Sequence, residues 1–472
     1  MDSHRMFFNI IAKRFILGIS IFILLSCNKR NVTQNTKQIT AQKNVKEVNW
    51  IAHWSGEGKR QQLVEEIAKE FEFKNQDIKI NLFYPETANK DGGGDSVEIS
   101  FMANEVLSQN PKFDIIRLKD YYPQIAKKLK DPDWGKKYLV DFSEFPDFVE
   151  KHQSFLFDDE YKNLNGGITI GPYNEGFYWT IWYNKAVADK MGIKVKQTGM
   201  TGDDLVGYIK TAHEYIVKNN SDVIPYFEEG VWLTSEMVMF QLFYSAVGDL
   251  NELKKPEFDP KKLQKLETVL NVFAEMSKYE PTFKDRSKIS WWSTTNYPLE
   301  GKCLFYVQGS WMYNIWEKKD KELLKNMYPA ELPTINGSAP CYIGGYKACW
   351  AVLKNAPHKE EAIKLMKYWA NPEVAENWVR STKCPTGIKG NLTSTTIGFD
   401  QFEDFQYNLS KKYGQNMITS TDNRYIFGMR NRAIKIPFID IMEKRKTVAQ
   451  VMAEIRRQIT YEKKIIPSTV IE

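Results

Sequence analysis

The sequence predicts an α/β protein with two lobes, each built on a mostly parallel sheet flanked by helices. Short apolar runs at residues 48–53, 78–82 and 113–116 have the length and alternation of β-strands. Between the first two runs, apolar side chains recur at helical spacing, at Leu63, Val64, Ile67, Ala68 and Phe71. Strand–helix–strand order at this spacing predicts right-handed βαβ units. About 430 residues follow position 44, too many for one hydrophobic core, so two lobes are expected.

The later elements are predicted from the same periodicities. Strands are predicted at residues 177–183, 303–307 and 348–353, and amphipathic helices at 123–129, 205–216 and 362–369. Thr447 and Gln450 have the spacing of a capping box, which predicts that the last helix begins there.

The first 27 residues have the features of a lipoprotein export signal. A basic segment runs into apolar residues 15–25, about half of the roughly 20 residues that a membrane-spanning helix needs. The run ends in Leu-Leu-Ser-Cys at 24–27, which resembles the bacterial lipobox, whose cysteine becomes the lipidated first residue. We therefore predict a signal peptide at 1–26 and lipidation of Cys27. An ordinary signal or a short membrane anchor is the alternative.

Residues 27–44 are predicted to be a lipidated, flexible tether. They are polar, lack periodicity and contain no aromatic residue, so they cannot bury enough surface to fold. A coil of this length reaches on the order of 20–25 Å. The mature protein is therefore expected to be exported and lipid-anchored to a bacterial membrane, in the periplasm or at the cell surface.

The charge and cysteine patterns exclude several classes of function. The net charge is +6, but both signs are interleaved without a basic run or zinc-finger spacing, so no nucleic-acid partner is expected. No cysteine lies in a CxxC motif and no histidine pair has metal-binding spacing, so no metal or cofactor is expected. Cys341 and Cys349 are close enough in sequence to close a short loop, and buried free thiols are the alternative. Aromatic residues make up 14% of the chain, which is typical of binding surfaces.

Several short motifs occur in a fixed order along residues 48–460. They are GPY followed by WYNK at 171–185, GK followed by GSW at 301–311, LP at 332–333, GGY followed by WAV at 344–352, and NPE at 371–373. In this order and spacing they resemble the sugar-binding group of solute-binding proteins of ABC importers, a group that includes maltose-binding protein. Residues 86–112 and 386–430 match poorly, and loops of this kind carry specificity.

The resemblance implies a two-lobe periplasmic-binding-protein fold, similar to type II, with a ligand cleft between discontinuous lobes. The N-terminal lobe is expected to comprise residues 45–174 and 344–392, and the C-terminal lobe residues 178–340 and 393–472. The implied function is reversible capture of a small mono- or oligosaccharide by hinge closure and delivery to the membrane subunits of an ABC transporter. No catalysis is expected, and a monomer suits this role.

Candidate ligand-binding residues lie where predicted strands end or where the chain crosses between lobes. They are Trp54, Ser55, Glu57, Asp120, Asn174, Glu175, Trp232, Trp311, Gly344, Gly345 and Tyr346. Aromatic rings stack on sugar C–H faces, carboxylates accept hydrogen bonds from vicinal hydroxyls, and glycines let the backbone approach the ligand. Core packing is the alternative role for Trp232, and holding a hinge is the alternative for Glu175.

Other functions remain open at this point. The same fold can bind a non-sugar solute such as a polyamine or a peptide. An exported glycoside hydrolase would need two carboxylates about 5–9 Å apart across one bond, and pairs such as Glu228–Glu229 are sequence neighbours that usually point apart. A surface adhesin or structural lipoprotein would lack a deep cleft.

Overall fold

The computed structural model describes residues 45–84, 94–118, 121–230, 233–255, 260–282, 286, 294–390, 401–414, 416–418 and 436–465. All of them belong to one compact unit, Val45–Glu472. The predicted signal peptide, Cys27 and the tether lie outside the described residues. Within the described ranges, no helix has the length and apolar character needed to cross a bilayer.

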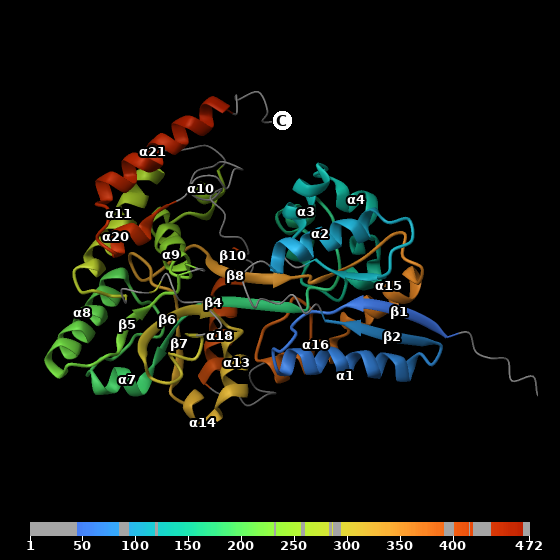
Figure 1. Ribbon diagram of the computed structural model, residues 1–472, viewed down its shortest axis with the longest axis horizontal. Coiled ribbons are helices and arrows are strands. Elements are labelled where there is room, and N and C mark those ends of the chain that lie inside the picture. Colours follow the sequence, from blue (N-terminus) through green and yellow to red (C-terminus); the bar gives the residue numbers. More distant parts are fainter. Residues whose placement is uncertain are drawn as a thin grey trace, which may run out of the picture. The chain divides into compact units, whose positions relative to one another are not determined.

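The first sheet has four strands in the order β2-β1-β3-β9 (Figure 1). They are β1 (Lys46–Ile51), β2 (Ile78–Phe83), β3 (Ile115–Arg117) and β9 (Trp350–Val352). Strand β1 pairs in parallel with both β2 and β3, and β9 is antiparallel to β3. The prediction of a mostly parallel sheet is therefore confirmed for this part of the chain.

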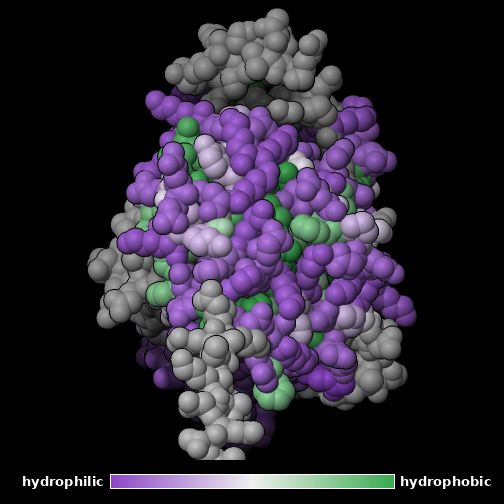
Figure 2. Space-filling model, turned by 90° about the vertical axis from the view of Figure 1, so that its right-hand side faces the viewer, coloured by the Kyte–Doolittle hydropathy of each residue, from purple (hydrophilic) through white to green (hydrophobic). Residues whose placement is uncertain are grey.

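Helices cover both faces of the first sheet and bury two hydrophobic clusters against it (Figure 1). One face is covered by α1 (Lys59–Lys74), α15 (Lys359–Trp369) and α16 (Pro372–Thr382). The other is covered by α2 (Gly94–Leu107), α3 (Tyr122–Leu129) and α4 (Trp134–Tyr138). The five apolar residues that predicted α1 are all buried. The outer surface at this end is predominantly hydrophilic (Figure 2), as expected for a solvated exterior.

Short helices connect this first region to the second sheet. They are α5 (Pro146–Val149), α6 (Asp159–Lys162) and the 3₁₀ turns Phe142–Glu144, Ser154–Phe157 and Asn163–Asn165.

The second sheet has strands in the order β10-β8-β4-β6-β5, with β7 also paired to β4. They are β4 (Glu175–Asn184), β5 (Ile224–Phe227), β6 (Cys303–Gly309), β7 (Met327–Ala330), β8 (Tyr342–Lys347) and β10 (Met417–Ile418). The helices of this region are α7 (Lys185–Lys190), α8 (Gly202–Asn219), α9 (Glu236–Val247), α10 (Leu250–Lys254), α11 (Pro260–Ser277), α13 (Met312–Lys319), α14 (Lys321–Leu324), α18 (Gln401–Tyr413), α20 (Phe438–Met442) and α21 (Val448–Ile465). The capping box predicted for α21 is present, because Thr447 and Gln450 each donate a backbone N–H to the other's side chain.

The second sheet is mixed, so the prediction of a mostly parallel sheet is wrong here. Strand β4 is antiparallel to β6, β7 and β8, whereas β5–β6 and β8–β10 are parallel. The reason is the path of the chain. It leaves the first core along β4 and returns to it along β8, and two adjacent strands that carry the chain in opposite directions must be antiparallel.

Strands β4 and β8 form the passage between the two hydrophobic cores. Tyr346 packs in a cluster of the first sheet, while Phe177 belongs to the cluster of the second. A Cβ on Gly344 would lie 2.7 Å from the carbonyl oxygen of Phe177, so the strand pairing itself requires glycine. A third segment joins the passage, since Gly176 donates its N–H to the Pro385 carbonyl at 2.7 Å. The predicted lobe boundaries remain a prediction, and all of β8 pairs within the second sheet.

Candidate functional site

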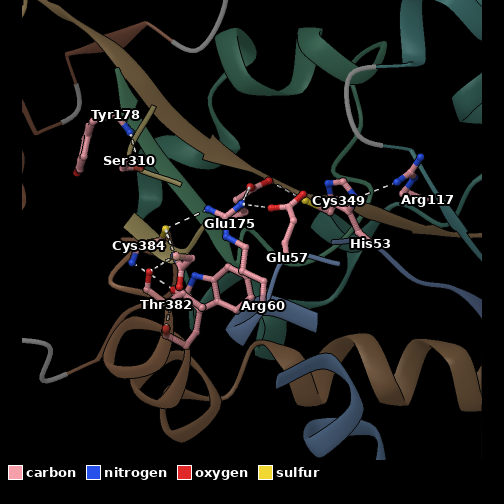
Figure 3. Close-up of polar contacts among 12 residues, drawn as sticks. His53, Glu57, Arg60, Arg117, Glu175, Tyr178, Ser310, Cys349, Thr382 and Cys384 are labelled. Atoms are coloured by element: carbon pink, nitrogen blue, oxygen red, sulfur yellow. Dashed lines mark hydrogen bonds and ion pairs between the residues drawn. The ribbon is translucent and has the colours of Figure 1, made fainter. Parts of the chain in front are cut away.

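A buried ion pair occupies the start of β4, where the chain passes between the cores (Figure 3). Glu175 Oε1 accepts a hydrogen bond from Arg60 Nη1 at 3.1 Å, and Oε2 accepts one from Cys349 Sγ at 3.1 Å. Arg60 Nη2 donates to Cys384 Sγ at 3.0 Å. Cys349 is therefore a thiol that donates to Glu175 and not half of the loop-closing disulfide considered from the sequence. Arg60 lies on α1 and Glu175 begins β4, while Cys349 directly precedes β9 and Cys384 follows α16. The ion pair therefore ties the passage to the first core.

Arg60 is held in its charged form by these surroundings. Burial alone lowers its pKa, but the electrostatic interactions with Cys384, Glu175 and Glu57 outweigh burial, so the pKa is raised. The guanidinium also lies 5.7 Å from the ring centroid of Trp54 and 5.9 Å from that of Trp378, within cation–π range. A permanent positive charge on Arg60 in turn keeps the Glu175 carboxylate oriented in the passage.

Three metal-type donors meet beside this pair. Ligand atoms of His53, Glu175 and Cys349 lie within 4.8 Å of one another, and all three residues are buried. Such a donor set suits zinc. However, Arg117 donates to His53 Nδ1 at 3.0 Å, whereas a metal-bound histidine normally donates from its second nitrogen. Glu175 Oε1 already accepts a hydrogen bond from Arg60. The described geometry therefore favours direct hydrogen bonding over a metal centre.

Arg117 itself is fixed by a second buried acid. Its Nε donates to Glu98 Oε1 at 2.6 Å, and its Nη2 pairs with the other carboxylate oxygen. Tyr121 donates to the same carboxylate at 3.2 Å. Arg117, which is held by Glu98, therefore fixes the orientation of the His53 ring.

An aromatic platform follows the carboxyl end of β6. The Trp311 ring lies directly over Gly309, because a Cβ on Gly309 would come within 2.0 Å of it. Trp179 meets Trp311 edge-on with ring centroids 5.1 Å apart, and Phe177 lies 6.3 Å away. Trp311 is only half-buried, unlike Trp179. The ring is therefore held rigidly by its neighbours while part of its surface faces solvent.

Two buried polar side chains near the passage and the end of β5 lack protein partners. Both amide atoms of Asn174, which is 1% exposed, have no hydrogen-bond partner among the described residues. The same holds for both carboxyl oxygens of Glu229, two residues beyond β5. An unpaired buried polar group is costly, so such groups mark places where a guest can supply partners. Glu229 was considered in the sequence only as a hydrolase acid, although its place after a strand signalled a site.

The adjacent acids Glu228 and Glu229 differ in their surroundings. Glu228 accepts hydrogen bonds from the backbone N–H groups of Thr234 and Ser235, at 3.0 and 2.8 Å. Burial raises the pKa of Glu228 to about 7 despite these donors. Burial and the charge of Glu228 raise the pKa of Glu229 to about 8.

The predicted site residues divide into those that the structure brings to the passage and those that it places elsewhere. Asn174, Glu175 and Trp311 lie at the passage or the adjoining strand end. Ser55 is exposed. Glu57 is half-buried, and its Oε2 lies 3.5 Å from Arg60 Nη1. Asp120 and Trp232 lie outside the described residues.

Trp54 is placed differently from its prediction. It is 1% exposed at a left-handed φ of 65°, and its ring packs against Trp350 and Trp378. Because its faces are occupied, it belongs to the aromatic core of the first sheet rather than to a ligand surface. Gly344, Gly345 and Tyr346 lie within β8, where they serve the pairing with β4 and packing.

Comparisons with known proteins place the chain in a family. Residues 66–397 match the model of the family described as bacterial extracellular solute-binding protein. The melibiose/raffinose/stachyose-binding protein MelE of Bacillus subtilis (strain 168) is 21% identical over 352 residues, which are 72% of this chain and 73% of that protein.

Solved structures share the fold at low sequence identity. The apo-form of RafE from Streptococcus pneumoniae is 15% identical with a TM-score of 0.60, covering 88% of this chain and 98% of that chain. A sugar transporter from Bacillus licheniformis, in complex with stachyose, is 17% identical with a TM-score of 0.53, covering 88% and 98%. The predicted α/β fold class is confirmed by these neighbours. Because the family model spans most of the sequence, this chain belongs to the bacterial extracellular solute-binding protein family.

Proposed function

We propose that this protein captures a small carbohydrate reversibly and delivers it to the membrane subunits of an ABC transporter. The observation that carries the proposal is the half-buried Trp311 platform on the same passage as the unpartnered amide of Asn174. A flat ring offers a surface for sugar C–H groups, and an unpaired amide offers both a donor and an acceptor for hydroxyls. The names of the relatives, MelE and the stachyose complex, agree with this ligand class.

The proposed ligand contacts centre on Asn174, Glu175 and Trp311. Asp120, Trp232, Ser55 and Glu57 remain proposed contacts on the ground of their positions after predicted or observed strands. Glu175 keeps two proposed roles, because the same carboxylate holds Arg60 and lies at the passage. A ligand hydroxyl that approaches it would meet a charged acceptor, which makes the stronger kind of hydrogen bond.

The proposed mechanism needs no chemistry on the ligand. Strands β4 and β8 and the segment near Pro385 are the connections about which two lobes can close. The ligand binds the closed state more tightly, so it shifts the population toward that state, which then docks on the transporter.

Thermal denaturation of residues 45–472 with a panel of sugars tests this function. We expect a saturable rise in Tm for one class of mono- or oligosaccharide, because a ligand of the native state stabilises it by mass action. Polyamines and short peptides serve as controls of other chemistry. A rise with those controls alone, or no rise with any sugar for a folded protein, would contradict the proposal.

We also propose that Cys27 carries the lipid that anchors the protein after export. Membership of an extracellular family supports export, and the lipobox-like residues before Cys27 support the anchor. Cys27→Ser should move the protein from the membrane fraction to the soluble fraction of the producing bacterium. Cys303→Ser, at a buried position, is the matched control and should stay with the membrane. Retention of Cys27→Ser in the membrane would contradict the anchor.

A further inference from the structure

Three buried side chains at the ends of β5 and β6 offer polar atoms that nothing described in the protein satisfies. They are the carboxyl oxygens of Glu229, the hydroxyl of Tyr306 and the amide nitrogen of Gln308, none of which has a hydrogen-bond partner of normal geometry among the described residues. All three residues are 0% exposed. Native proteins bury few such groups, so their concentration at one place needs an explanation.

The three side chains are neighbours. Tyr306 and Gln308 are alternate residues of β6, so they lie on the same face of the sheet. Phe227, the last residue of β5, pairs with Tyr306, and Glu229 follows two residues later. Burial, and then the charge of Glu229, raise the pKa of Tyr306, while the Gln308 side chain opposes that rise. We call Glu229, Tyr306 and Gln308 the β5–β6 polar niche.

The protonation of the niche follows from the groups around Glu229. Glu228, its neighbour in the chain, accepts hydrogen bonds from Thr234 and Ser235 and, with a pKa of about 7 against about 8 for Glu229, ionises first. Arg286 donates to the backbone carbonyl of Glu229 at 3.1 Å, and within the described ranges it makes no hydrogen bond to the Glu229 carboxyl group. With a pKa of about 8, Glu229 is a neutral acid at pH 7.

A neutral carboxylic acid, a phenol and an amide together offer both donors and acceptors but no net charge. An alcohol hydroxyl has the same double character, so it can satisfy the niche without burying a charge.

We propose that the β5–β6 polar niche is a subsite that binds a hydroxyl group of the captured ligand. The proposal rests on the carbohydrate function proposed above, and it adds polar contacts near the end of β6, the strand that precedes Trp311. It also predicts the pH dependence of capture. Ionisation removes the Glu229 donor, so affinity stays level below pH 8 and falls above it, by at most about tenfold per pH unit.

Isothermal titration of the full-length protein in detergent with raffinose tests the subsite. Wild-type protein should bind about tenfold more weakly at pH 9 than at pH 7 and should take up a proton on binding at pH 8.5. Glu229→Gln, which stays neutral, should show no decline in affinity between pH 7 and pH 9. Tyr306→Phe should bind about tenfold more weakly at both pH values, because the buried ligand hydroxyl loses the Tyr306 hydroxyl as a hydrogen-bond partner.

Tyr226→Phe is the matched control. Tyr226 lies on the adjoining strand β5, and its buried hydroxyl also lacks a described partner. Its ring packs in the second sheet's main cluster, whereas Tyr306 packs in the cluster on the opposite face. Tyr226→Phe should therefore keep wild-type affinity.

The outcomes separate the subsite from the proposed function. Wild-type binding that is level from pH 7 to 9 without proton uptake overturns the subsite, and this measurement needs no variant to fold. Equal affinities of Tyr306→Phe and Tyr226→Phe also overturn it, while carbohydrate capture stands. If wild-type protein binds neither raffinose nor any other sugar of the panel at pH 6, both proposals fail.

Stability provides a second readout of Glu229. Its folded-state pKa of about 8 lies above the unfolded value near 4.5, so its contribution to stability is lost as pH rises from 4.5 to 8. Glu229→Gln should therefore raise Tm more at pH 9 than at pH 6. A Tm difference that does not change with pH would contradict a neutral acid at this position.

Discussion

Trp311→Ala should abolish high-affinity ligand binding while the protein stays folded. Removing the ring takes away the stacking surface, and truncation of an anchoring aromatic residue costs at least about 2 kcal/mol, roughly 30-fold in affinity. The fold should persist because Trp311 is only half-buried, and truncation of a half-exposed ring leaves a smaller cavity than that of a core residue. Calorimetric titration measures the affinity, and circular dichroism with a thermal melt measures the fold.

The neighbouring Tyr313 supplies a control for Trp311. It is also half-buried and lies two residues further along, but its ring stacks on Phe402 with centroids 5.0 Å apart. Tyr313→Ala should keep the affinity of the wild-type protein. Trp311→Phe retains a flat ring and should recover part of the binding. Unchanged affinity in Trp311→Ala would remove Trp311 from the site.

Arg60→Met should destabilise the protein by about 3–5 kcal/mol, because it leaves the Glu175 carboxylate buried without its charged partner. The side chains of Arg60 and Glu175 are 3% and 10% exposed, so water cannot replace the guanidinium. Methionine keeps the apolar contact with Trp54 and Trp378, so the loss reports mainly on charge. Urea denaturation of the wild-type and variant proteins gives the free energies of unfolding.

A double variant distinguishes the ion pair from general disruption. Arg60→Met combined with Glu175→Gln removes both charges and should recover a large part of the stability. Arg380→Met is the surface control. Arg380 pairs with Glu376 on α16 at an exposed position, where an ion pair contributes at most about 1 kcal/mol. If Arg60→Met is no more destabilising than Arg380→Met, the ion pair between Arg60 and Glu175 does not stabilise the fold.

Local periodicity was sufficient for several helices, for most strands and for the parallel pairing of β1 in the first sheet, whereas helices such as α2, α9 and α11 were not predicted. The five apolar positions of α1 are buried, and β1 runs parallel to β2 and β3, because one amphipathic helix between two strands leaves only that connection. The family resemblance, read from motifs spread between residues 171 and 373, agrees with the family that the comparisons identify.

The sequence pattern could not predict the direction of the strands in the second sheet. An apolar strand such as β4 has the same periodicity whichever way its neighbours run. Its three antiparallel pairings follow from the passage of the chain between cores, which no local segment encodes.

The polar groups of the candidate site show the same division. The expected crossover between lobes predicts Asn174 and Glu175 as ligand contacts. The end of a strand predicts Trp311 in the same way. Trp54 shares that position, yet its backbone at φ 65° turns the ring into the core.

The sequence by itself determined some of the helices, most strands and the fold class, since hydrophobic period and turn residues act over a few positions. Only the tertiary structure decided which residues meet. Arg60 forms hydrogen bonds with Glu175 and Cys384, which are 115 and 324 positions away in the sequence. Glu229 and Tyr306 come together because β5 pairs with β6. Burial and long-range pairing decide which groups of the site are charged and which of its buried polar atoms have hydrogen-bond partners among the described residues. Both properties depend on packing that no single segment contains.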